Sequence, residues 1–99
     1  MFAILVRFKA IKGKEKAMED VFRQVIDKVR HNEKDTLLYD MHRRLDDPTE
    51  ILFYERYTDR NAWEATHCSQ PYIKQLLKDL EPYLECEFEV TEYELIEAK

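Results

Sequence analysis

The residue pattern predicts an α+β fold whose elements follow in the order β-α-β-β-α-β. Three observations support this prediction. Apolar residues alternate with other residues near both ends of the chain, which is typical of strands. Two central segments alternate in the same way and flank a turn. Two other segments carry apolar residues every three or four positions, which is typical of helices. This order is the split arrangement called ferredoxin-like.

The first strand is predicted where Phe2, Ile4, Val6 and Phe8 alternate with other residues. A helix of about five turns is expected after Gly13, with a charged outer face. Its apolar stripe consists of Ala17, Met18, Val21, Phe22, Val25, Ile26 and Val29.

The central hairpin is predicted to contain strands over 37–44 and 50–57, joined at Asp46-Asp47-Pro48. Asp59 is expected to cap a short helix that ends at His67, and Ser69 to cap a second helix over 70–80. Pro71 falls in the first turn of that second helix, where its missing N–H costs nothing.

The last strand is predicted from Leu84, where apolar residues alternate with glutamates as far as Val90. The apolar positions then change parity to Tyr93 and Leu95. A β-bulge near Thr91-Glu92 would place these later apolar side chains on the same face of the strand as the earlier ones. Basic residues crowd the start of the chain and acidic residues its end, so we expect the first and last strands to be neighbours.

Both faces of the central hairpin carry apolar side chains. Leu37, Tyr39 and Met41 share one face of their strand, and on the next strand Leu52 and Tyr54 oppose Ile51, Phe53 and Tyr57. Two helices can cover only one side of a four-stranded sheet. We therefore expect a second copy of the chain to cover the other side and form a homodimer.

Length and composition narrow the possible classes of protein. The 99 residues fit one domain, 1–99, and the formal charge of −5 argues against a non-specific nucleic-acid binder. No apolar run is long enough to span a membrane and no signal peptide is visible, so we expect a cytoplasmic protein without a membrane partner. Cys68 and Cys86 lack redox or zinc spacing and are expected to stay reduced.

The segment 53–72 resembles the signature of the antibiotic biosynthesis monooxygenase family, which includes quinol monooxygenase-like proteins. The matching residues are Glu55, Tyr57, Asp59, Ala62, His67, Ser69 and Tyr72. The resemblance continues over most of the chain and implies a dimeric α+β barrel. The family often has a glycine where this chain has Asp35 or Thr36, so the resemblance does not predict the shape of the turn that enters the second strand. Known activities include cofactor-free oxidation of quinols and anthrones, isomerisation of a phosphorylated autoinducer-2 breakdown product, and haem degradation.

The resemblance and the residue types together suggest a candidate site. His67 can accept a proton near neutral pH, or it can satisfy carbonyl groups at a helix end. Glu55 lies in an apolar strand, so it either lines a polar cavity or pairs with a basic residue. The candidate catalytic residues are His67, Glu55 and Tyr57, and the candidate substrate-binding residues are Tyr72, Tyr39 and Trp63. The alternative for these aromatic residues is a place in the core or dimer interface.

Three functional hypotheses follow. The first is a cofactor-independent monooxygenase that oxidises a quinol- or anthrone-like aromatic substrate with dioxygen. The second is an isomerase of a small hydroxy-ketone phosphate, which would need Arg43, Arg44 or Arg56 to bind the phosphate. The third is a dimer that binds a small molecule without reaction. No histidine or carboxylate spacing predicts a metal site, and haem is not expected, because Leu76 stands where haem-degrading relatives have their proximal histidine.

Overall fold

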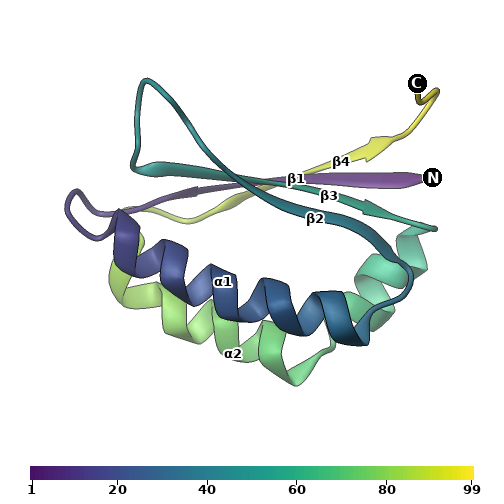
Figure 1. Cartoon of the computed structure of the whole chain (residues 1–99), viewed down its shortest axis with the longest axis horizontal. Helices are drawn as coiled ribbons and strands as arrows, with labels where there is room; N and C mark the ends of the chain where they lie inside the picture. The colour runs from purple at the N-terminus through teal and green to yellow at the C-terminus, as the bar shows by residue number, and fades with distance from the viewer.

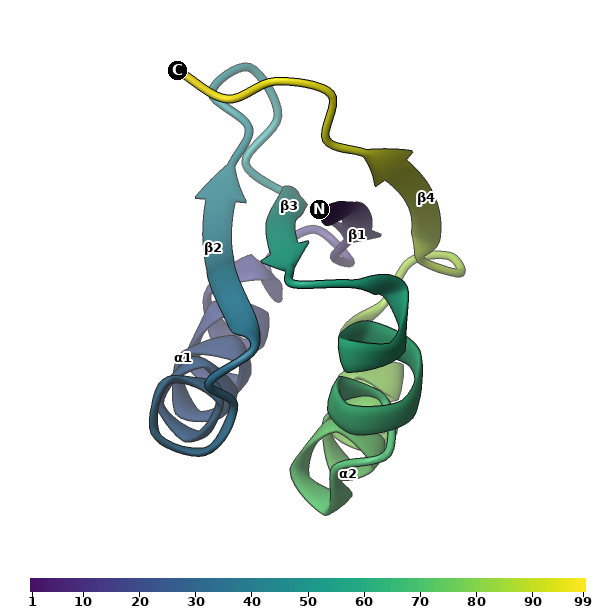
Figure 2. The ribbon, with the colours of Figure 1, turned by 90° about the vertical axis from the view of Figure 1, so that its right-hand side faces the viewer.

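Four strands form one antiparallel sheet, and both long helices lie on the same face of it (Figures 1 and 2). The structure is a computed structural model that describes residues 1–99. Its elements are β1 (Phe2–Lys9), α1 (Glu15–Asn32), β2 (Thr36–Arg43), β3 (Glu50–Tyr57), the π-helix η1 (Ala62–His67), α2 (Pro71–Leu80), the 3₁₀ turn η2 (Glu81–Tyr83) and β4 (Glu89–Glu94). The predicted ferredoxin-like α+β fold is confirmed. None of the helices is both long and apolar enough to cross a membrane.

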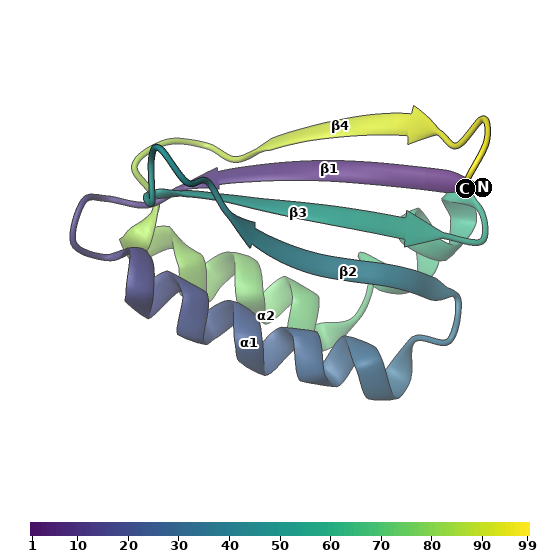
Figure 3. The same ribbon diagram turned by 45° about the horizontal axis from the view of Figure 1, so that its top comes forward.

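The strand order is β2-β3-β1-β4, so the first and last strands are neighbours, as the charge distribution predicted (Figure 3). Arg7 and Glu89 face each other across the β1–β4 ladder and form an ion pair. Strand β2 lies at one edge of the sheet, above α1 (Figure 3).

The core fills the space between the sheet and the helices. The Phe22 ring of α1 lies 4.8 Å from Phe8 of β1 and 4.7 Å from Phe53 of β3, measured between ring centroids. Alternate residues of β3 point into this core, so Ile51, Phe53 and Tyr57 are almost fully buried. Glu55 lies on the same face of β3 and is therefore drawn into the core as well.

One local prediction was wrong at the start of α2. Ser69 does not cap α2, because its hydroxyl donates to the carbonyls of Ala65 and Thr66 and so satisfies the end of η1. Gln70 precedes α2 in an extended conformation and supplies no side-chain cap. Pro71 occupies the first turn as predicted, where the missing N–H needs no partner.

The last strand is shorter and more regular than its pattern predicted. Leu84 forms only an isolated bridge with Ala10, and β4 begins at Glu89. Its pairing with β1 runs without a bulge at Thr91-Glu92. Every residue of β4 is exposed. Neither face of this strand has to stay apolar, so the change in the apolar pattern needs no bulge. The irregularity in the sheet lies instead between Thr36 and Leu38.

No helix covers the face of the sheet opposite α1 and α2 (Figure 2), and the centre of this face is apolar. Leu38 of β2, Leu52 and Tyr54 of β3, and Leu5 of β1 lie on this face, which we call the open face. Met41 belongs to the helix-facing side, where it packs against the core. The expectation that both faces of the hairpin are apolar is thus confirmed.

An ion pair between a buried carboxylate and a half-exposed arginine fastens α1 to the edge strand. The Glu19 side chain of α1 is only 5% exposed, and Arg43 of β2 donates to it from Nε over 2.8 Å and from a second nitrogen. These charged hydrogen bonds hold the pKa of Glu19 below its usual value, although burial opposes the shift.

We expect Arg43→Gln to lower the free energy of unfolding measurably, because the buried Glu19 would lose its bidentate partner and keep only Arg23, which lies 3.6 Å from one of its oxygens. Arg30→Gln is the matched control, since Arg30 and Asp27 form an ion pair whose side chains are 67% and 65% exposed, and its loss should change stability by less than about 0.5 kcal/mol. Urea denaturation measures both. Equal losses in the two variants would contradict the structural role of the Glu19–Arg43 pair.

Candidate functional site

A short π-helix places His67 beneath the sheet. Asp59 accepts a hydrogen bond from the backbone N–H of Ala62 over 2.8 Å and fixes the start of this segment, as predicted. The backbone N–H of Cys68 donates to the carbonyl of Trp63, five residues earlier. Such wide turns often occur at functional sites. Here the turn ends with the His67 side chain buried.

His67 is held by a carboxylate that the sequence analysis did not identify. Its Nδ1 lies 2.7 Å from Oε1 of Glu33, in the connection between α1 and β2. The hydroxyl of Thr36 donates to the same oxygen over 2.8 Å, and the hydroxyl of Tyr72 donates to the other oxygen. The Glu33 side chain is 1% exposed. One carboxylate thus joins residues from β2, η1 and α2.

Glu33 stays ionised despite its burial. Burial alone would raise its pKa, but hydrogen bonds from His67, Tyr72 and Thr36 outweigh this effect and hold the pKa below its usual value. A carboxylate that accepts several hydrogen bonds is stable in a dry environment because these bonds replace its water shell.

Glu55 has the opposite character. It is 4% exposed, and the only hydrogen bond to its side chain comes from the hydroxyl of Tyr57 over 2.6 Å. Burial raises the pKa of Glu55 from 4.5 to about 7, with nearby Glu33 adding to the rise and His67 opposing it. Near neutral pH this carboxyl group therefore carries a proton in a large fraction of molecules.

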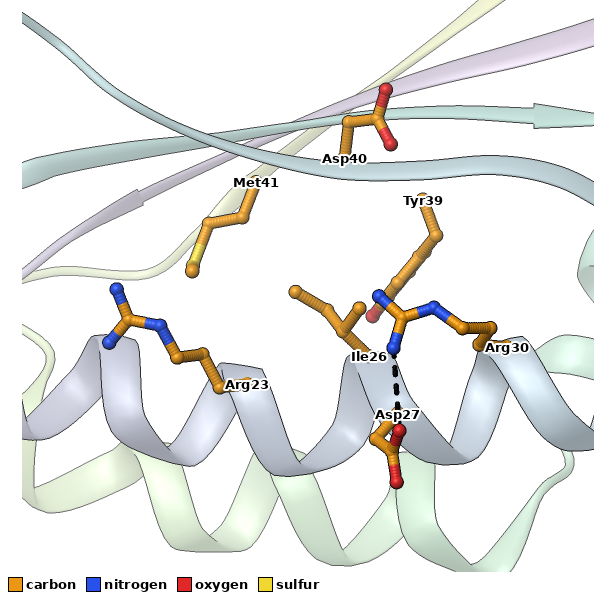
Figure 4. A pocket seen from close by; sticks show the side chains of 7 residues that line it. All are labelled: Arg23, Ile26, Asp27, Arg30, Tyr39, Asp40 and Met41. Atoms are coloured by element: carbon orange, nitrogen blue, oxygen red, sulfur yellow. Dashed lines mark hydrogen bonds and ion pairs between the residues drawn. The ribbon is translucent and has the colours of Figure 1, made fainter.

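A groove lies between α1 and the edge strand β2 (Figure 4). The larger part has a volume of about 550 Å³. Ile26, Tyr39 and Met41 form its apolar surface, and the charged side chains of Arg23, Asp27, Arg30 and Asp40 line the rest. The adjoining part, about 240 Å³, extends to Glu33. The ring of Tyr39 lies 5.1 Å from the ring of His67, so Tyr39 separates the groove from the buried histidine.

The structure brings most of the predicted site residues together. The residues that gather around His67 are Glu55, Tyr57, Tyr72 and Tyr39. Trp63 does not join them, because it packs on Phe2 and under the guanidinium of Arg60. No group of three or more histidine, cysteine or acidic side chains is arranged to hold a metal ion.

The three arginines that the isomerase hypothesis requires lie away from this cluster. Arg43 is bound to Glu19, and Arg44 is bound to Asp46 and Glu50 beside the hairpin turn. Arg56 lies on the open face of the sheet, where it donates to the hydroxyl of Tyr54. None of them is placed to bind a phosphate next to His67.

Comparison with known protein families gives a match over most of the chain. Residues 1–79 match the family model described as antibiotic biosynthesis monooxygenase. The chain belongs to the antibiotic biosynthesis monooxygenase family. A search of curated proteins found no match. Membership in this family supports a monooxygenase-type role in which the protein binds a small molecule.

Solved structures share the fold of this family member over nearly its full length. One antibiotic biosynthesis monooxygenase superposes with a TM-score of 0.88 at 20% identity, covering 98% of this chain and 100% of the other. A protein of Caulobacter crescentus CB15, provisionally given the same description, has a TM-score of 0.91 at 21% identity, with 97% and 90% covered. A protein of Mycobacterium tuberculosis has a TM-score of 0.88 at 22% identity, with 98% and 96% covered.

We expect Glu55→Gln to stabilise the protein more at high pH than at low pH. Because the folded pKa is raised to about 7, the folded state of the wild type holds a proton that the unfolded state loses at lower pH. The free energy of unfolding of the wild type should therefore fall by up to about 3 kcal/mol as pH rises from about 5 to 8, and that of Glu55→Gln should not show this fall. Glutamine keeps an acceptor for Tyr57 and does not ionise. Thermal melts across this range measure the effect, with the exposed Glu85→Gln as control. A difference between Glu55→Gln and wild type that does not vary with pH would contradict it.

Proposed function

We propose that this protein is a cofactor-independent monooxygenase that oxidises a quinol- or anthrone-like aromatic substrate with dioxygen. The observation that carries the proposal is the buried cluster of His67 with two carboxyl groups beside a groove with an apolar wall. In this chemistry the substrate first loses a proton, and the resulting electron-rich anion gives an electron to dioxygen. The protein then needs a base, hydrogen bonds for the anion and little water.

His67 is the proposed base. It is 4% exposed and lies against the rings of Tyr39 and Tyr57, which keep water from it. A proton acceptor in such a place competes with few water molecules. Tyr39 borders both the groove and the His67 ring, so a planar substrate in the groove reaches the histidine only when the Tyr39 ring turns aside.

Glu55 and Glu33 have different proposed roles in the reaction. Two carboxyl groups whose surroundings move their pKa values in opposite directions are suited to different roles in one reaction. Glu55 holds a proton near neutral pH and is the proposed hydrogen-bond donor to the substrate oxygen, with Tyr57 orienting it. Dioxygen is the only co-substrate that this proposal requires.

We also propose that the protein is a homodimer, joined by the open faces of two sheets. Leu5, Leu38, Leu52 and Tyr54 give this face an apolar centre.

His67→Ala should reduce oxygen consumption with a dihydroxynaphthalene or anthrone by about 10²–10⁴-fold, the range for loss of a general base. The measurement uses an oxygen electrode and protein purified free of flavin, haem and metal. His31→Ala is the matched control, because His31 is an exposed histidine on α1 and its loss should leave turnover unchanged.

Two results would count against the proposal. Unchanged turnover in a folded His67→Ala variant would remove the histidine from the mechanism. No oxygen consumption by the wild type across a panel of quinols and anthrones would favour the isomerase or the non-enzymatic binding protein.

Tyr54→Asp should convert the dimer to a monomer, because it places an unpaired charge at the centre of the open face. The melting temperature should fall with the dimer content. Light scattering at micromolar concentration measures the mass, and Leu77→Asp on the exposed side of α2 is the control that should stay dimeric. A monomeric wild type would contradict the dimer proposal.

A further inference from the structure

Glu33 is the one side chain that binds His67 and ties it to two other elements. It follows α1 directly, and it accepts hydrogen bonds from His67 at the end of η1, Tyr72 on α2 and Thr36 at the start of β2. Its side chain is less exposed than that of His67, at 1% against 5%. The carboxylate therefore has a fixed position, set by three parts of the fold.

The chemistry of a carboxylate determines which nitrogen of His67 carries the proton. An ionised carboxyl group has acceptors and no donor. The Nδ1 atom, 2.7 Å from Oε1 of Glu33, must therefore be the donor, so the neutral ring is the Nδ1–H tautomer. The lone pair of the neutral ring is then on Nε2, which makes Nε2 the only ring atom able to accept a proton.

We propose that Glu33 is the positioning residue of this site, which holds His67 in the Nδ1–H tautomer and so makes Nε2 the proton acceptor. The inference rests on the proposed role of His67 as the base. In the step concerned, a substrate O–H or C–H bond breaks, its electron pair stays on the substrate, and an N–H bond forms at Nε2. The positive charge that then appears on the ring lies next to the negative charge of Glu33, which stabilises it.

Tyr72 acts through Glu33 in this scheme. Its hydroxyl proton is directed to Oε2 of Glu33, and Thr36 donates to the other oxygen. Both hydroxyl groups keep the carboxylate oriented towards Nδ1 of the histidine. The position of the catalytic nitrogen thus depends on residues from β2 and α2 that do not contact the ring through hydrogen bonds of their own.

The first test does not depend on activity. Two-bond ¹⁵N–¹H correlation spectra of the labelled protein at about pH 9, where imidazoles are neutral, report which nitrogen of His67 carries the proton. We expect a protonated Nδ1 in the wild type and in Glu33→Gln, whose amide oxygen can still accept the bond. Glu33→Leu should lose this preference. Glu19→Leu, which removes a buried carboxylate near the opposite end of α1, should leave the His67 signals unchanged.

The second test is kinetic. Glu33→Leu should lower kcat by about 10²–10⁴-fold, as loss of the base itself would, with a much smaller change in KM. Glu33→Gln keeps the tautomer but removes the charge, and it should lower kcat by about 10-fold or more. A wild-type His67 protonated on Nε2, or a Glu33→Leu variant that keeps Nδ1–H, would overturn the inference. The expected tautomers without any oxygen consumption would instead overturn the proposed function and leave the positioning role intact.

Discussion

The arrangement of this site depends on how a small protein keeps a negative charge in its interior. An ionised carboxyl group loses the stabilisation of water when it is buried, and it remains charged only if hydrogen bonds replace that water. Glu33 receives such bonds from three side chains on three different elements. The same bonds that keep it ionised also fix the connection after α1, the end of η1 and the start of α2. The hydrogen bonds that stabilise the charge of Glu33 therefore also hold these parts of the fold together.

The main elements could be predicted from the sequence because they follow simple periodicities. The apolar stripe of α1 and the alternation in β1 and β3 specify which residues are buried, and the structure agrees. The limits of β4 could not be predicted in this way. An edge strand that is exposed on both faces has no buried set of residues, so its parity carries no information.

The site was predictable only in part, for a similar reason. His67 and Glu55 stand out because polar residues are unexpected at apolar positions of η1 and β3, and the family signature includes both. Glu33 lies among Asn32, Lys34 and Asp35, where a carboxylate looks like any other surface residue. Only the three-dimensional structure shows that the chain turns this one side chain inward. The π-helical turn of η1, which orients His67, likewise has no recognised residue pattern.

The two carboxylates at either end of α1 also determine how much room lies beside the edge strand. Glu19 ties the helix to Arg43 near one end of β2, and Glu33 ties the following connection to Thr36 at the other. Between these two attachments the helix advances about 1.5 Å per residue, so they lie about 21 Å apart along its axis. The groove occupies this interval. Its length is therefore set by the number of helical residues between Glu19 and Glu33.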